Sequence, residues 1–131
     1  MGQFNRLVES QKRIGSRFPL AGASGEFFCI PSESSNMFCL NVWITVKDPS
    51  HVETVRGLLT ELGRLSRAEP GCIRYEVCHS QADATRFLLC ERWESQAAWE
   101  HHRTLKGFTE IYQPQVLPLV NREPHISTLL E

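Results

Sequence analysis

The chain has 131 residues, of which 41% are hydrophobic and 22% charged, and its formal net charge is −1 at pH 7. This composition is typical of one soluble globular domain. The near-neutral balance argues against nucleic acid or an anionic membrane as the main partner, because both select basic surfaces. No apolar run approaches the roughly 20 residues that span a bilayer. The five cysteines include no CxxC pair, which indicates reduced thiols in a cytoplasmic protein and no zinc site.

The first 36 residues differ in composition from the rest. Hydrophobic spacing predicts a short amphipathic helix over about residues 3–14, and a stretch rich in glycine and serine follows it. We therefore expect an N-terminal extension or arm over residues 1–36 and a compact domain over residues 37–131.

The domain opens with a predicted strand over residues 37–47. Phe38 and Leu40 fall on one face of this strand, and Asn41 and Trp43 fall on the other. A helix is expected next, with Ser50 as its N-cap and Glu53 completing a capping box. Its apolar stripe consists of Val52, Val55, Leu59, Leu62 and Leu65, and Pro70 and Gly71 end it.

Two further strands are predicted over residues 71–80 and 86–93, joined as a hairpin by a polar turn. In the first, Ile73, Tyr75 and Val77 share a face. In the second, Phe87, Leu89, Glu91 and Trp93 share a face.

The remainder reads as helical segments and a final strand. Ser95 can cap a helix from Gln96 to Lys106, and a further helical piece is expected over residues 108–113, before Pro114. A last strand is predicted over residues 124–131.

The resulting order is β-α-β-β-α-β, which predicts an α+β fold of the ferredoxin-like type with helices on one face of an antiparallel sheet. The other sheet face also carries apolar and aromatic side chains, among them Trp43 and Leu88. Because an uncovered apolar face implies a partner, we expect a homodimer formed through the sheet faces.

Two pairs of residues are the leading candidates for chemistry. Strand parity places Glu91 and Trp93 on one face. A carboxylate there either forms a salt bridge with Arg74, Arg92 or a residue of the other subunit, or acts as a base with a raised pKa.

Helix spacing places Trp99 and His102 together, and His101 elsewhere. His102 is interpreted either as a proton shuttle or as a half-buried residue bonded to a backbone carbonyl.

Tyr75, Tyr112 and Asn41 are the remaining polar groups that can point inward and bind a substrate oxygen, or simply belong to the core. No histidine pair has metal-ligand spacing, and no phosphate-binding or nucleophile motif is present. The sequence therefore predicts neither a metal nor a bound cofactor.

The segments GCIRYEV and RFLLCERWESQAAWEHH resemble the antibiotic biosynthesis monooxygenase superfamily. The matching positions in this chain are Gly71, Tyr75, Val77, Glu91, Trp93, Ser95, Ala98 and His102. The resemblance implies a dimeric α/β-barrel with a pocket between sheet and helices, in the branch of quinol monooxygenases and autoinducer isomerases. Two positions depart from its patterns: Leu89 stands where the aromatic oxygenases have Asn, and Gly107 where the isomerase branch has a second histidine.

Three functions follow as hypotheses. The first is a cofactor-independent monooxygenase of a small quinol or aromatic substrate, with His102, Glu91 and Trp93 as catalytic residues and Trp99, Tyr75, Asn41 and Tyr112 as substrate-binding residues. The second is an isomerase of a phosphorylated sugar-like molecule, which needs cationic contacts from Arg74, Arg92 or Arg103. The third is a non-catalytic ligand-binding or assembly domain.

Overall fold

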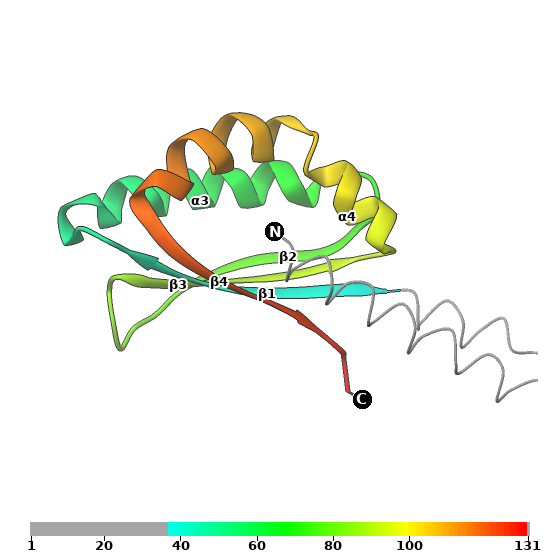
Figure 1. Cartoon of the computed structure of the whole chain (residues 1–131), viewed down its shortest axis with the longest axis horizontal. Helices are drawn as coiled ribbons and strands as arrows, with labels where there is room; N and C mark the ends of the chain where they lie inside the picture. The colour runs from blue at the N-terminus through cyan, green and yellow to red at the C-terminus, as the bar shows by residue number, and fades with distance from the viewer. Residues whose placement is uncertain (1–36, 131) are drawn as a thin grey trace, which may run out of the picture.

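A computed structural model of the chain describes residues 37–130 (Figure 1). The extension expected over residues 1–36, including its short helix, lies outside the described residues. Within the described part of the chain, no helix is both long and apolar enough to cross a membrane.

Four antiparallel strands form one open sheet in the order β2-β3-β1-β4. The strands are β1 (Phe38–Val46), β2 (Cys72–His79), β3 (Arg86–Trp93) and β4 (Val120–Ser127). This order and the helices between the strands confirm the predicted ferredoxin-like α+β fold.

The helices lie together on one side of the sheet, as Figure 1 shows. They are α3 (Val52–Arg67), α4 (Gln96–His102) and the π-helix η3 (Gly107–Val116), with short 3-10 turns at η2 (Pro49–His51) and η4 (Leu117–Leu119). Alternate residues of β1 face this layer and are buried, starting with Phe38 and Leu40. Val55, Leu59 and Leu62 of α3 pack onto the same core, as the predicted stripe requires.

A β-bulge near the start of β2 corrects the predicted face of Ile73. Cys72 pairs with Trp93 and Arg74 pairs with Arg92, so the pairing register shifts between them and Ile73 is the extra residue. The side chain of Ile73 is 52% exposed, whereas Cys72 packs against the core. The alternation of β2 therefore changes sides at the bulge.

The helix ends also differ from prediction. Asp48, not Ser50, provides the cap: its carboxylate accepts a hydrogen bond from the Ser50 N–H at 3.0 Å and starts the η2 turn before α3. Ser95 does cap α4, accepting from Ala98 N–H at 3.1 Å. The α4 helix ends at His102 and not at Lys106, and the Thr104 hydroxyl bonds the His101 carbonyl just beyond it.

Two prolines lie inside secondary-structure elements of the C-terminal third, where the sequence predicted an element to end or begin. Pro114 lies inside η3, where the buried Tyr112 and Val116 hold the segment against the core on both sides of it. Pro124 lies inside β4, which begins at Val120, four residues earlier than predicted. β4 is an edge strand, and an edge tolerates a residue without an N–H donor.

A single close contact sets the distance between β2 and α4. Gly71 has φ +81°, a conformation that other residues rarely adopt, and a Cβ at this position would lie 2.6 Å from the Cβ of Ala98. The Gly71 carbonyl also accepts a hydrogen bond from Glu94 N–H at 2.8 Å. Glycine is therefore required where the chain enters β2.

Replacing Gly71 should destabilise the domain strongly. Gly71→Ala adds both the cost of a positive φ and a clash with Ala98, so we expect a loss of about 2 kcal/mol or more in the free energy of unfolding, measured by urea denaturation. Gly57→Ala is the matched control, since its Cβ would meet nothing within 4 Å. It should stabilise α3 by about 0.5–1 kcal/mol. Equal effects at the two glycines would contradict this account.

Candidate active site

Four buried side chains meet between the sheet and α4. The ring of His102 lies 4.6 Å from that of Trp93 and 6.0 Å from that of Tyr75, measured between centroids. Trp93 and Tyr75 meet edge to face at 6.4 Å. Glu91 lies on the same sheet face and is 5% exposed. The structure thus brings together residues from β2, β3 and α4, as strand parity and helix spacing predict.

Glu91 is held by its neighbour on the strand. The indole N–H of Trp93 donates a hydrogen bond to the Glu91 carboxylate at 3.0 Å. Arg74 and Arg92, the salt-bridge partners considered from the sequence, lie on the other side: Arg74 pairs instead with Glu76. Burial raises the pKa of Glu91 to about 7, against the opposing effects of the Trp93 hydrogen bond and the charge of Arg122.

His102 is paired with an acid that sequence reasoning missed. The Nδ1 atom of His102 lies 2.6 Å from Oε1 of Glu69, and the two side chains are only 4% and 9% exposed. The sequence predicted His102 either as a proton shuttle or as a half-buried residue bonded to a backbone carbonyl. Neither prediction included the Glu69 carboxyl group. A histidine with Nδ1 engaged by a carboxylate keeps Nε2 as the atom that can accept a proton.

Burial acts on both partners in the direction of the neutral form. It raises the pKa of Glu69 to about 7. It also lowers the pKa of His102 to about 4, with a further contribution from the charge of Arg103. The imidazole is therefore neutral at physiological pH.

The position of Glu69 follows from the packing of Gly71. Ala98 and His102 are four residues apart and share a face of α4. Because Gly71 touches Ala98, the residue two positions before it reaches His102. One signal in the sequence pointed to Glu69: an acidic residue just after the C-terminal end of a helix is unfavourable there and needs a partner.

The other aromatic candidates surround this centre. Trp99 is buried and stacks on Phe38 at 4.7 Å, with the guanidinium of Arg103 5.0 Å from its ring. Phe108 of η3 lies 5.8 Å from the His102 ring and 5.4 Å from Tyr112.

The buried Tyr112 is linked to β4. Its hydroxyl oxygen accepts a hydrogen bond from Arg122 Nε at 3.0 Å, and burial raises its pKa. The π-helix therefore carries two aromatic side chains onto the site, and π-helical segments are frequent at functional sites.

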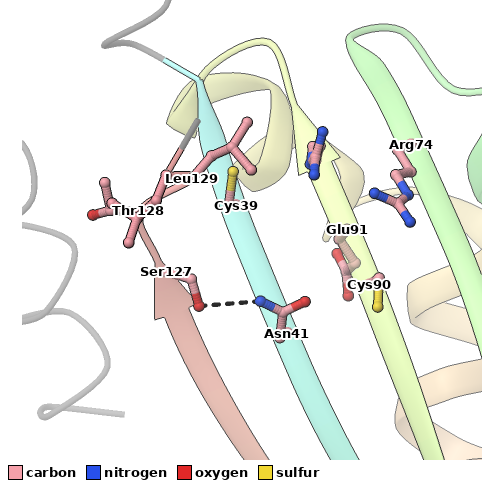
Figure 2. A pocket seen from close by; sticks show the side chains of 10 residues that line it. Cys39, Asn41, Arg74, Cys90, Glu91, Ser127, Thr128 and Leu129 are labelled. Carbon is pink, nitrogen blue, oxygen red and sulfur yellow. Dashed lines mark hydrogen bonds between the residues drawn. The ribbon is translucent and has the colours of Figure 1, made fainter.

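Asn41 lies on the opposite face of the sheet, away from His102. Its side-chain amide donates a hydrogen bond to Ser127 Oγ at 3.1 Å, drawn as a dashed line in Figure 2. Together with Cys39, Cys90 and Glu91 it lines a pocket of about 150 Å³ (Figure 2). The structure does not bring Asn41 together with Tyr75 and Tyr112.

The three arginines considered for a phosphate are likewise not gathered. Arg74 and Arg92 line the same pocket as Asn41, and Arg103 lies over aromatic rings beside α4. Among residues 37–130, no group of three or more His, Cys, Asp or Glu side chains has the geometry to hold a metal ion.

The fold and the buried acid–imidazole pair define the class: a ferredoxin-like domain with a polar site between sheet and helices. The model of the antibiotic biosynthesis monooxygenase family matches residues 37–113, and the chain belongs to this family. No curated protein matches the sequence significantly.

Solved structures agree with this assignment. The protein PA3566 from Pseudomonas aeruginosa is 28% identical, with a TM-score of 0.67 over 73% of this chain and 96% of its own. A protein described as an antibiotic biosynthesis monooxygenase is 22% identical, with a TM-score of 0.64 over 71% and 99% of the two chains. A conserved protein from Methanosarcina mazei Go1 is 22% identical, with a TM-score of 0.65 over 72% and 94%. The last two share the fold alone.

Removing the ionisable group of Glu91 should stabilise the domain at high pH only. Its pKa is raised from an ordinary 4.5 to about 7, so its contribution to stability is complete below about pH 4.5 and is lost as the pH rises through 7. Glu91→Gln keeps an acceptor for Trp93 and cannot ionise. We expect a higher Tm than wild type at pH 8.5, by roughly 4–8 °C per kcal/mol gained.

Thermal denaturation followed by circular dichroism at pH 5.5 and 8.5 measures this difference. Glu76→Gln is the control, because Glu76 is exposed and its pKa is lowered by the hydrogen bond from Arg74. That variant should not gain stability at pH 8.5. A Glu91→Gln protein no more stable than wild type at pH 8.5 would contradict burial as the dominant influence on Glu91.

Proposed function

We propose that the chain is a cofactor-independent monooxygenase acting on a small quinol or related aromatic substrate. The observation that carries the proposal is the Glu69–His102 pair, buried against Trp93 in a domain of the antibiotic biosynthesis monooxygenase family. The description of one similar structure as a monooxygenase supports it.

In this reaction the substrate itself reduces dioxygen. In an anthrone-type phenol, a carbon that carries two hydrogens becomes a carbonyl. In a hydroquinone, one ring C–H becomes C–OH while the ring is oxidised to the quinone. In both cases one oxygen atom of O2 enters the substrate, and the other leaves as water with two hydrogens from the substrate. The substrate supplies all four electrons. What the protein must provide is a base that generates the electron-rich anion and a pocket that excludes bulk water.

The proposed base is His102. Its neutral imidazole takes the substrate proton at Nε2, while Glu69 holds Nδ1 and stabilises the resulting imidazolium. Glu91 and Trp93 form the adjoining wall, and their mutual hydrogen bond fixes the indole against the His102 ring. Trp99, Tyr75 and Tyr112 complete the aromatic surroundings, with the Tyr112 hydroxyl available to a substrate oxygen.

Substitution of His102 should abolish oxygen consumption. Purified chain is supplied with hydroquinones and anthrone-type phenols, and oxygen uptake is followed with an electrode. We expect His102→Ala to lower kcat at least 100-fold, as is common for loss of a general base. Glu69→Gln keeps the imidazole but removes the carboxylate, so kcat should fall with little change in KM.

The neighbouring His101→Ala is the matched control, because His101 is exposed at the adjacent position of α4. Its activity should equal that of wild type. Absence of turnover with all substrates, or turnover unaffected by His102→Ala, would overturn the proposal.

We also propose that the chain forms a homodimer through the sheet face that carries no helix in the described part of the chain (Figure 1). Trp43 and Leu88 are directly paired on this face and are only half-buried. The guanidinium of Arg86 lies 4.5 Å from the centre of the Trp43 ring. A second copy related by a two-fold axis would bury these side chains.

A charge on this face should separate the dimer. Leu88→Glu places a carboxylate at its centre, and sedimentation velocity should then show a monomer where wild type shows a dimer. Thr54→Glu, on the exposed side of α3, should leave the dimer intact. Circular dichroism verifies that both variants are folded. A monomeric wild type, or a Leu88→Glu dimer, would contradict the proposal.

A further inference from the structure

A second pocket, outside the proposed active site, lies between α3 and the strands β2 and β3. It has a volume of about 300 Å³, at the lower end of the range of small-molecule sites. The residues that line it include Arg56, Gly63, Arg67, Val77, His79 and Phe87.

Glycine at position 63 brings α3 close to β2 at the wall of this pocket. Arg56, Gly63 and Arg67 are seven and four residues apart, so they lie along one stripe of the helix. A Cβ on Gly63 would lie 3.2 Å from Arg67 Nη1 and 3.3 Å from Val77 Cγ2. Gly63 therefore lets the helix approach β2, and the floor beside it is apolar, built from Val77 and the buried Phe87.

The rim of this pocket is cationic and partly fixed in place. Arg67 Nη1 donates a hydrogen bond to the Tyr75 carbonyl at 2.9 Å, which orients the guanidinium and leaves its other N–H groups for a ligand. His79 stacks on Phe87 at 4.1 Å, and its Nε2 donates to the Ala84 carbonyl at 2.8 Å. The imidazole is thereby held through Nε2, and its Nδ1 atom does not bind the Ala84 carbonyl.

Arg56 lies at the N-terminal end of this stripe of α3 residues. It lies 3.5 Å from Glu53, but both side chains are well exposed, and such a pair contributes little. None of the described residues that line the pocket is acidic. Two guanidinium groups therefore share the pocket without a carboxylate among its walls.

We infer that this pocket binds a small organic carboxylate. The carboxylate lies on the planar donor fork of Arg67, which matches its geometry, and Arg56 adds positive charge. The apolar body of the ligand covers Val77 and Phe87 and reaches the His79 ring. Inorganic phosphate would use the same cations but would leave the apolar floor uncovered. The inference is independent of the proposed monooxygenase reaction, because no described residue that lines this pocket is among the proposed active-site residues.

The test compares three probes on the full-length protein at constant ionic strength. Benzoate, benzyl alcohol and inorganic phosphate are titrated while the backbone amides of Gly63, Val77 and His79 are followed by NMR. Benzoate should shift these amides at millimolar concentration and bind at least several-fold more tightly than either other probe. If benzyl alcohol binds as tightly as benzoate, the arginines do not contribute to binding. If phosphate binds as tightly as benzoate, the apolar floor of the pocket does not contribute. Either result overturns the inference.

Variants identify the residues. Arg67→Gln should weaken benzoate binding roughly tenfold, since one charge-assisted hydrogen-bonded contact is lost. Because Arg67 also holds the Tyr75 carbonyl, Arg56→Gln serves as a second variant and should weaken binding without disturbing the fold. Arg64→Gln is the matched control: Arg64 is exposed on α3, pairs with Glu61 and does not line the pocket. Absence of any benzoate shift, or equal affinity in all three variants, overturns the inference.

Discussion

The contact between the Glu69 carboxyl and the His102 imidazole is the constraint on which the rest of the site depends. It joins the segment after α3 to the C-terminal end of α4, two parts of the chain 33 residues apart. The contact is possible because Gly71 and Ala98 approach so closely that a Cβ on Gly71 would clash with Ala98. With α4 in this position, the His102 ring lies against Trp93 and Tyr75.

Such an arrangement is costly for the fold. Three ionisable side chains, Glu69, Glu91 and His102, are removed from water within one region, and burial shifts each pKa toward the neutral form. Glu91 is compensated by the hydrogen bond from the Trp93 indole and by the charge of Arg122. Glu69 and His102 are compensated by the hydrogen bond between them. A domain of this size has little stability to spare. Groups with perturbed pKa values that share a buried region mark a candidate functional site.

Much of the fold could be predicted from the sequence, because the periodicity of apolar residues follows which side chains are buried. The alternation in β1 and β3 placed Glu91 and Trp93 correctly, and the three-residue spacing on α4 separated His102 from His101. Periodicity fails where the backbone departs from regular geometry, and the bulge at Ile73 is such a place. It also fails for an edge strand, since Pro124 obscured the true start of β4.

The candidate site was predictable only in part, for a related reason. Glu91, Trp93 and His102 belong to regular elements, whereas Glu69 lies in a connection whose path depends on Gly71 having a positive φ. A loop residue can be placed only when the packing around it is known. Asn41 illustrates the opposite error: its parity on β1 already assigned it to the other face, and chemical type alone made it a candidate.

In the proposed reaction, the Glu69–His102 pair lets a buried site accept a proton from a neutral substrate. Isolated in this environment, His102 is a poor base, because burial lowers its pKa to about 4. With Glu69 ionised, which its pKa of about 7 permits in neutral to alkaline solution, the pair carries one negative charge before the reaction. Transfer of a proton to Nε2 makes the pair neutral overall and leaves the negative charge on the substrate. The charge is thus moved within the low-dielectric region and not created there, so the desolvation that weakens His102 alone does not oppose the transfer to the pair.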